Sequence, residues 1–157
     1  RWQVVAARLA EYYDLEAGDS VIDVGCAKGF LVKDFQDLNI DACGIDVSRY
    51  AIRNSVARNC RVGNATHIPY AKQSFDLAVS INTLHNLPKS GVAAALAEMR
   101  RVARRQYVVL DAWTTAKEKK SIEAWNLTAK TILSLDEWLK FFKKIGYTGE
   151  YAWTINR

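Results

Sequence analysis

Two short segments near the amino terminus constrain the fold of this chain more than any other feature. The first, VIDVGCAKG at 21–29, reads as an apolar strand that ends in a turn of small residues. The second, GIDVS at 44–48, places Asp46 at the end of another strand, 21 residues after Gly25. Small residues let the backbone approach a ligand closely, and a carboxylate at this spacing holds a ribose. The two segments therefore predict a site for a nucleotide-type cofactor.

Strand-like and helix-like segments alternate along the whole sequence. Apolar strands are expected at 21–25, 42–47, 60–65, 75–82, 106–113 and 147–156, and amphipathic helices at 2–13, 29–38, 49–59, 91–105 and 135–146. This alternation predicts an α/β fold, with a doubly wound, mostly parallel sheet and helices on both faces. Ligands bind such sheets at the carboxyl ends of the strands. One cleft is therefore expected to gather the strand ends at 25–29, 46–48, 63–66, 80–85 and 111–114.

Length and composition fit one domain over residues 1–157, with half of the residues hydrophobic. No apolar run is long enough to span a membrane, and no signal peptide is visible. The three cysteines form no CxxC pair, which predicts reduced thiols, a cytoplasmic protein and no metal site. The first residue is Arg1 rather than Met, which indicates a processed form or a fragment.

The formal charge is +5, and basic residues cluster at 99–105 (MRRVARR) and 117–120 (KEKK). Solvated helix faces are the simplest interpretation of these clusters. A nucleic-acid footprint would require the charges to share one surface beside the site.

The spacing of the small residues distinguishes between cofactors. A dinucleotide fingerprint has glycines two and then three residues apart, whereas Gly25, Ala27 and Gly29 are two and two apart. Asp23 precedes this turn, and a carboxylate there suits a positively charged ligand group better than a pyrophosphate. The chain also lacks the GxxxxGK[ST] phosphate loop.

The segment DVGCAKG at 23–29 resembles motif I, D/ExGxGxG, of the class I S-adenosylmethionine-dependent methyltransferases of small-molecule type. GIDVS resembles the second motif of that family, and 63–80 resembles its third-strand motif, short loop and fourth strand. The resemblance spans nearly the whole chain, with Ala27 in place of the middle glycine. It implies a Rossmann-like sheet of six or seven strands in the order 3-2-1-4-5-(7)-6. It also implies S-adenosylmethionine as the cofactor and S-adenosylhomocysteine as the product.

The resemblance assigns several residues to the amino-acid end of this cofactor. Asp23 is expected to hold the amino group, in part through water, although it could instead be a structural turn acceptor. Gly29 is expected to let the first helix start close to the ligand, and Ser80 to lie near the same end. The backbone that lines this end is expected to come from Gly25, Cys26 and Ala27.

The nucleoside end is assigned in the same way. Asp46 is expected to accept hydrogen bonds from both ribose hydroxyls, and Val47 to pack on the adenine. Asn64 is expected beside the adenine amino group, and the Ala65 amide beside a ring nitrogen. The alternatives are that Asp46 caps a helix or ends a strand at the surface, and that Asn64 is an ordinary turn residue.

Catalytic candidates follow the fourth and fifth strands. His85, in INTLHNLP, is the best candidate for a general base, because an imidazole transfers protons near neutral pH. A histidine that caps a helix or is satisfied in the core is the alternative. Asp111, in VLDAW, is expected to orient a substrate or to cap the next segment. Residues 114–133, a loop with a helical piece around 121–130, are the expected specificity element.

The methyl acceptor is less constrained. The fourth strand ends in SINT rather than [DNS]PP[YF], no Pro-Cys pair is present, and no metal-ligand cluster is evident. A small molecule methylated at O, N or C is therefore the default acceptor. An RNA or protein acceptor that uses the basic surface, and a catalytically inactive module that binds S-adenosylmethionine, remain open.

Only one strand, at 147–156, follows the final helix, whereas the family's sheet normally ends in two strands. The sheet is therefore six-stranded or the chain is truncated. An exposed edge strand would invite pairing with a partner.

Overall fold

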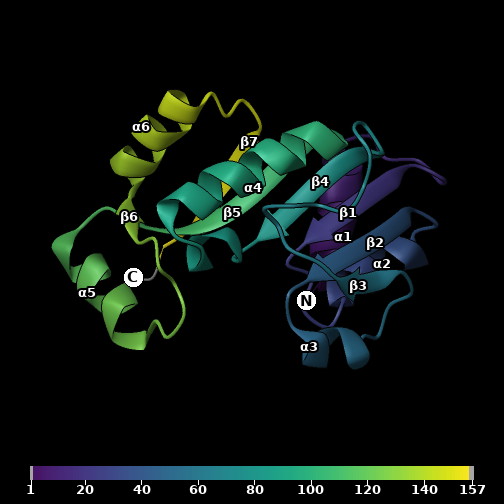
Figure 1. Ribbon diagram of the computed structural model, residues 1–157, viewed down its shortest axis with the longest axis horizontal. Helices are drawn as coiled ribbons and strands as arrows, with labels where there is room; N and C mark the ends of the chain where they lie inside the picture. The colour runs from purple at the N-terminus through teal and green to yellow at the C-terminus, as the bar shows by residue number, and fades with distance from the viewer. Residues whose placement is uncertain (1, 156–157) are drawn as a thin grey trace.

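Seven strands form one sheet in the computed structural model, which describes residues 2–155. They are β1 (Ser20–Val24), β2 (Asp41–Asp46), β3 (Cys60–Val62), β4 (Phe75–Ile81), β5 (Ala103–Trp113), β6 (Leu133–Ser134) and β7 (Glu150–Thr154). Their order is β3-β2-β1-β4-β5-β6, with β7 beside β5, and every pair of these strands is parallel (Figure 1). The predicted doubly wound sheet is confirmed.

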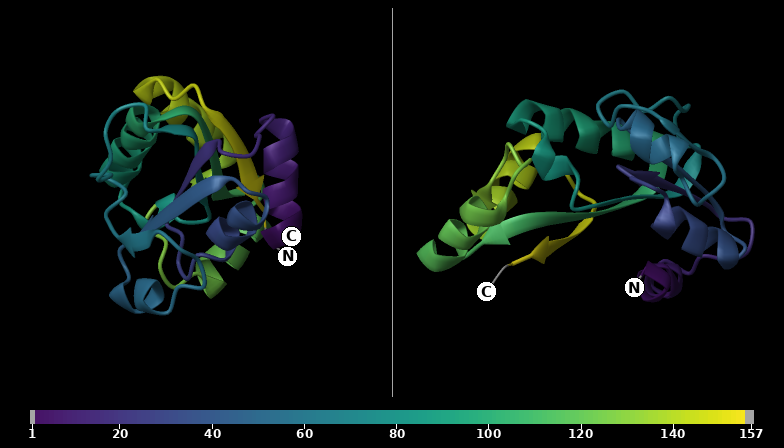
Figure 2. Two further views of the ribbon diagram at one scale, coloured as in Figure 1. Left: turned by 90° about the vertical axis from the view of Figure 1, so that its right-hand side faces the viewer. Right: turned by 90° about the horizontal axis from the view of Figure 1, so that it is seen from below.

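Helices cover both faces of this sheet (Figure 2). They are α1 (Trp2–Tyr12), α2 (Phe30–Asp37), α3 (Arg49–Arg53), α4 (Lys89–Val102), α5 (Ala116–Trp125) and α6 (Leu135–Ile145), with a 3-10 helix η1 at Leu84–Asn86. One buried core joins α1 and α2 to the sheet, and a second core joins α4 and α6 to the opposite face. The alternation of side chains along β1 and β4 feeds both cores, as a sheet covered on both faces requires.

Several helix ends follow from their local sequence. The Ser48 hydroxyl accepts a hydrogen bond from the Ala51 amide and caps α3, as its position before the helix predicts. Ser134 forms a capping box with Glu137 at the start of α6. Gly146 ends α6 with a φ of 71°, in the left-handed region that glycine favours.

The expected helix at 49–59 is wrong in its second half, because α3 ends at Arg53. The Val56 amide donates a hydrogen bond to the Lys28 carbonyl, so the chain turns back toward the glycine turn rather than continuing as a helix. This tertiary contact overrides the helical spacing of the side chains.

Segment 114–133 contains a helix that lies earlier than the predicted piece around 121–130. Thr115 and Glu118 form a capping box that starts α5. The Asn126 side chain then accepts hydrogen bonds from the Thr128 and Ala129 amides, which form a turn and end the helix. The specificity role of this segment stays a prediction.

One strand, β7, follows the last helix, as predicted, and it is shorter than the expected range 147–156. Its expected end at residue 156 lies outside the described residues. Among the described strands β7 pairs with β5 alone, so it forms an edge of the sheet. No helix within residues 2–155 has the length and apolar character needed to cross a membrane.

Candidate cofactor site

A cavity of about 320 Å³ lies at the carboxyl ends of the first strands of the sheet. Four of the expected strand ends, at 25–29, 46–48, 63–66 and 80–85, contribute to its wall, whereas the end of β5 at 111–114 does not. A larger groove of about 590 Å³, between α1, β5 and β7, contains none of the predicted site residues. The residues that line the smaller cavity are Gly25, Ala27, Ile45, Asp46, Val47, Gly63, Asn64, Ala65, Thr83, Asn86 and Leu87.

Backbone hydrogen bonds fix the turn after β1. The amides of Gly25 and Cys26 both donate to the Ile45 carbonyl, at 2.8 and 3.0 Å. Gly25 has a φ of 86°, and a Cβ atom there would lie 2.2 Å from the Thr83 side chain. Glycine is therefore required at this position by its backbone angle and by its neighbour. Ala27 has a φ of 48°, which is strained for a residue with a Cβ atom and explains why glycine suits this place in the motif.

The Asp46 carboxylate connects this turn to the end of β2. One of its oxygens accepts from the Ala27 amide at 2.9 Å, and the other accepts from the Ser48 amide at 2.8 Å. Each carboxylate oxygen has a second lone pair, so both can still accept from a ligand. Asp46 lines the cavity, which places it where a ribose-binding carboxylate is needed.

Asp23 is nearly buried and lies on the α2 side of β1. Its side chain is 5% exposed and makes no hydrogen bond or ion pair with another residue in the described range 2–155. Burial, reinforced by Cys60 and Asp46, raises the pKa of this carboxyl to about 7. The expected structural turn acceptor is therefore not what the structure shows. A buried acid without a partner is suited to a cationic ligand group.

The nucleoside side of the cavity offers apolar surface and the backbone amide of Ala65. Val47 is 70% exposed at the cavity wall, and Ala65 lies across from the end of β2. Across residues 2–155, the Ala65 amide has no hydrogen-bond partner. Asn64 lines the cavity, but its side-chain oxygen accepts from the Thr66 amide and hydroxyl, which is the turn role expected as its alternative.

Four of the predicted cofactor residues do not line the cavity, namely Asp23, described above, and Ser80, Gly29 and Cys26. The Ser80 hydroxyl is buried and donates to the Val24 carbonyl at 2.7 Å, so it braces β4 against β1. Gly29 faces the chain at 55–60, where a Cβ atom would lie 2.9 Å from the Cys60 sulfur. The Cys26 side chain points into the core between β1 and α2.

Thr83, Asn86 and Leu87 line the cavity and were missed from the sequence. They follow β4, and the rule that ligands bind at strand ends indicates this region but not these side chains. The Thr83 hydroxyl donates toward the Gly25 and Ile81 carbonyls, which holds the segment after β4 over the glycine turn.

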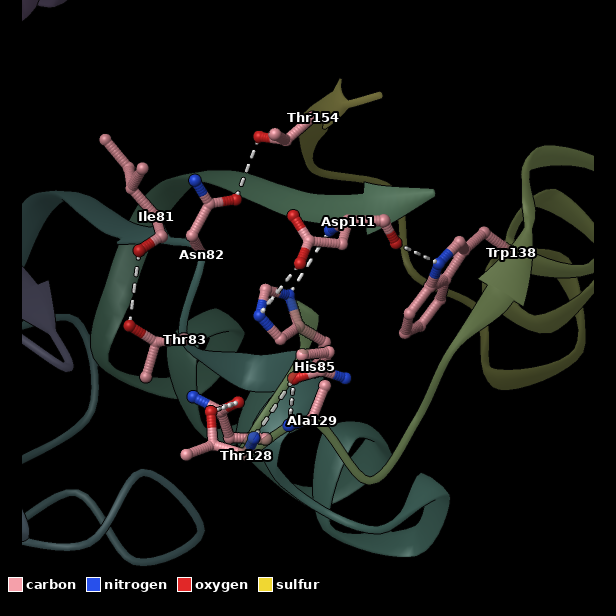
Figure 3. A network of polar contacts seen from close by, with 11 residues as sticks. Ile81, Asn82, Thr83, His85, Asp111, Thr128, Ala129, Trp138 and Thr154 are labelled. Atoms are coloured by element: carbon pink, nitrogen blue, oxygen red, sulfur yellow. Dashed lines mark hydrogen bonds and ion pairs between the residues drawn. The ribbon is translucent and has the colours of Figure 1, made fainter. Parts of the chain in front are cut away.

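His85 and Asp111 form a buried pair beyond the cavity (Figure 3). The Asp111 amide donates to His85 Nδ1 at 3.2 Å, and Nε2 lies 3.5 Å from the Asp111 carboxylate. Burial lowers the pKa of His85 against the pull of Asp111, and it raises the pKa of Asp111. The imidazole is thus neutral with its proton on Nε2, and both ring nitrogens face Asp111. This geometry favours a core-satisfied histidine over a general base.

The same pair anchors the loop after α5. The His85 carbonyl accepts hydrogen bonds from the Lys130 and Thr131 amides, and the Thr131 hydroxyl donates to the Leu87 carbonyl. The Trp138 indole donates to the Asp111 carbonyl at 3.0 Å (Figure 3). Helix η1, which carries Asn86 to the cavity wall, is therefore bonded to β5 and segment 114–133, and β5 is bonded in turn to α6.

We expect His85→Ala to lower the free energy of unfolding by roughly 1–2 kcal/mol, because the Asp111 amide is left buried without an acceptor. His67→Ala is the matched control, since His67 is exposed and its ring forms a hydrogen bond with the Thr66 hydroxyl at the surface. Its unfolding free energy should change by less than about 0.5 kcal/mol. Urea titration of both variants measures the difference, and equal losses would contradict the assigned contacts.

The basic run 99–105 lies away from the cavity, at the amino end of β5. The Arg101 guanidinium donates hydrogen bonds to the Glu98 carboxylate and to the carbonyls of Ile68 and Tyr70. Arg104 and Arg105 form ion pairs with carboxylates of the neighbouring strands. The arginines of this run therefore form contacts within the fold. The second basic cluster, 117–120, lies on α5, which follows β5 at the carboxyl edge of the sheet.

Comparison with known proteins identifies the family to which this chain belongs. The family model of the methyltransferase domain matches residues 22–110, more than half of the chain. The chain belongs to this family. The match begins within β1 and ends within β5, so it contains the glycine turn, Asp46 and the cavity.

Two relatives in sequence act on different acceptors, as their names state. The tRNA (carboxymethyluridine(34)-5-O)-methyltransferase of Arabidopsis thaliana is 28% identical over 144 residues, which cover 88% of this chain and 34% of that protein. Phosphoethanolamine N-methyltransferase 1 of Triticum aestivum is 34% identical over 82 residues, which cover 45% of this chain and 16% of that protein. The chain thus spans about a third or less of the length of these relatives.

A solved structure shows the same fold at low sequence identity. The structure of a SAM-dependent methyltransferase from Archaeoglobus fulgidus matches with a TM-score of 0.72 and 16% identity, covering 93% of this chain and 69% of that one. The methyltransferase fold, Rossmann-like and of class I, is therefore confirmed. In residues 2–155 no group of three or more His, Cys, Asp or Glu side chains could hold a metal ion.

Proposed function

We propose that the chain binds S-adenosylmethionine in the cavity at the carboxyl ends of β1–β3 and transfers its methyl group to an acceptor. The observation that carries this proposal is the pairing of two carboxylates with different environments. Asp46 lines the cavity with lone pairs free for hydroxyl groups, and Asp23 is buried nearby without a hydrogen-bond partner among residues 2–155. A ribose diol and an ammonium group are the ligand groups that these two sites suit.

The other residues fit the rest of the ligand. The apolar wall at Val47 suits a flat adenine ring, and the free Ala65 amide suits an acceptor nitrogen on that ring. The backbone at Gly25, Cys26 and Ala27 would lie along the amino-acid end. Ser80 and Gly29 would act through the backbone they support, because neither lines the cavity.

The bound cofactor would supply a methyl group that its sulfonium already activates. The chain's own residues would then align the acceptor with that group and exclude water. His85 and Asp111 support this by holding η1 and the loop at 126–131 in place, as positioning residues rather than as an acid and a base. Segment 114–133 would select the acceptor, because it is anchored directly behind Asn86 and Leu87.

Two acceptor classes follow from the relatives. A small molecule is the first, as in the phosphoethanolamine enzyme. An RNA is the second acceptor class. It is supported by a relative whose alignment covers 88% of this chain and whose name states a tRNA substrate. The lysines of α5 lie at the carboxyl edge of the sheet, where an acidic acceptor would approach.

Release of labelled methyl groups onto pools of tRNA and of small amines or acids tests both classes. If RNA is the acceptor, Lys117→Glu/Lys120→Glu should lower transfer to tRNA by about tenfold, because two phosphate contacts are lost. Lys72→Glu is the control, since Lys72 lies in the loop before β4, at the opposite edge. Transfer to neither pool, with intact cofactor binding, would favour the inactive-module alternative.

A further inference from the structure

Cys26 and Cys60 lie close together on the α2 side of the sheet, where two glycines leave room for their sulfur atoms. Gly44 is the partner of Cys60 in the β2–β3 ladder, and a Cβ atom on Gly44 would lie 2.6 Å from the Cys26 sulfur. A Cβ atom on Gly29 would lie 2.9 Å from the Cys60 sulfur. Both cysteines also pack in the same core cluster. The two thiols therefore meet in a space that side chains at 29 and 44 would fill.

The two thiols have different chemical character. The hydrogen bond with Cys26 is the main reason that the pKa of Cys60 is lowered to about 6, and the Ser55 hydroxyl and Gly44 amide lower it further. The same hydrogen bond, together with burial, raises the pKa of Cys26. Cys60 is half-buried, whereas Cys26 is 6% exposed. Cys60 is therefore the more acidic thiol of the pair, and Cys26 is the one that keeps its proton more firmly.

We propose that Cys26 and Cys60 form a peroxide-sensitive pair, with Cys60 as the attacking sulfur and Cys26 as the resolving one. The Cys60 thiolate attacks one oxygen of hydrogen peroxide, the O–O bond breaks, and hydroxide leaves, which gives a sulfenic acid. The Cys26 sulfur then attacks the Cys60 sulfur, the S–O bond breaks, and the leaving hydroxide takes the Cys26 proton, while the hydroxide from the first step takes a proton from solvent. The products are one disulfide and two water molecules, so two thiols are oxidised and one peroxide is reduced.

The position of Cys26 gives this oxidation a consequence for the cofactor site. Cys26 lies between Gly25 and Ala27, and its amide shares the Ile45 carbonyl with that of Gly25. A disulfide would draw the Cys26 side chain toward β3 and shift the turn that Asp46 holds through the Ala27 amide. This consequence rests on the proposed function, whereas the disulfide itself does not.

The experiment treats the full chain with hydrogen peroxide, blocks remaining thiols with N-ethylmaleimide under denaturing conditions, and maps tryptic peptides without reduction. Trypsin places the three cysteines in separate peptides, 9–28, 34–49 and 59–61. We expect a cross-link between 9–28 and 59–61 that dithiothreitol removes. Cys43 is the internal control, because it is buried in the core on the opposite face of β2 and should stay alkylated.

Cys43→Ser should leave the cross-link intact, and Cys26→Ser should replace it with sulfenic or sulfinic acid on Cys60. Cys60 that overoxidises in the wild-type chain without joining Cys26, or thiols that all remain alkylated, would overturn the pairing. Oxidised wild-type protein should bind S-adenosylmethionine about tenfold more weakly, with recovery on reduction. Unchanged affinity would overturn the link to the cofactor. A cross-link in a chain that never binds the cofactor would instead contradict the proposed function and leave the pair standing.

Discussion

Asp46→Ala is expected to weaken S-adenosylmethionine binding by about 1.5–3 kcal/mol, because hydrogen bonds between a charged carboxylate and the ribose hydroxyls are lost. This corresponds to roughly a 10- to 150-fold increase in Kd. The same change frees the amides of Ala27 and Ser48, so the free energy of unfolding should fall by about 1 kcal/mol. Calorimetric titration with the cofactor measures the first effect, and urea unfolding measures the second.

Asp41→Ala provides the matched control for this change. Asp41 is exposed at the start of the same strand, at the opposite edge of the sheet from the cavity. Its loss should leave cofactor affinity unchanged. Affinity that is equal in the wild-type chain and Asp46→Ala would remove Asp46 from the site, and equal losses in both variants would assign the effect to net charge alone.

Asp23→Asn is expected to stabilise the ligand-free chain at pH 8 and to weaken cofactor binding at the same pH. The pKa of Asp23 is about 7 in the folded chain, against an ordinary value of 3.8. The unfolded chain releases this proton near pH 4, and the folded chain keeps it to about pH 7. The folded chain therefore binds more protons in this window, and its stability falls as pH rises.

The size of this effect follows from the pKa difference. The carboxyl should cost the wild-type chain roughly 2–4 kcal/mol of unfolding free energy between pH 4 and pH 8. Asn has the same shape without the charge, so the variant should lack this decline and exceed the wild-type stability at pH 8. Urea unfolding at pH 5 and pH 8 measures both slopes. Parallel pH profiles for the two proteins would show that Asp23 does not carry the proton assigned to it.

Ionisation of Asp23 should raise the affinity for the cofactor, although it lowers the stability of the ligand-free chain. An ammonium group pairs with the ionised form of Asp23, so wild-type affinity should rise between pH 6 and about pH 7.5, below the pKa of an α-amino group. Asp23→Asn should bind more weakly and with a flat profile over this range. Asp41→Asn, which leaves Asp23 intact, should keep the wild-type profile.

Local chemistry explains why much of the fold was predictable. The apolar strands at 21–25 and 75–82, the caps at Ser48 and Ser134, and the turn at Gly146 each depend on residues adjacent in sequence. The glycine turn also carries its own signal, because the backbone angles at Gly25 and Ala27 require small residues. Strand order was predicted from the family resemblance alone, because local sequence does not encode it.

What could not be predicted depends on contacts between distant segments. The end of α3 at Arg53 is set by the bond from Val56 to Lys28, and the two-residue strand β6 exists only because β5 is beside it. The burial of Asp23 without a hydrogen-bond partner among residues 2–155 is likewise a property of the packed structure. The burial of His85 against Asp111 is also set by distant segments, and helical or strand periodicity contains no information about it.

Calorimetric titration of the chain with S-adenosylmethionine, in parallel with NAD, tests the central claim most directly. The account predicts a single site for S-adenosylmethionine with micromolar affinity or better, weakened in Asp46→Ala, and no detectable heat of binding for NAD. Failure to bind S-adenosylmethionine, or comparable binding of NAD, would contradict the assignment of the cavity at the ends of β1–β3.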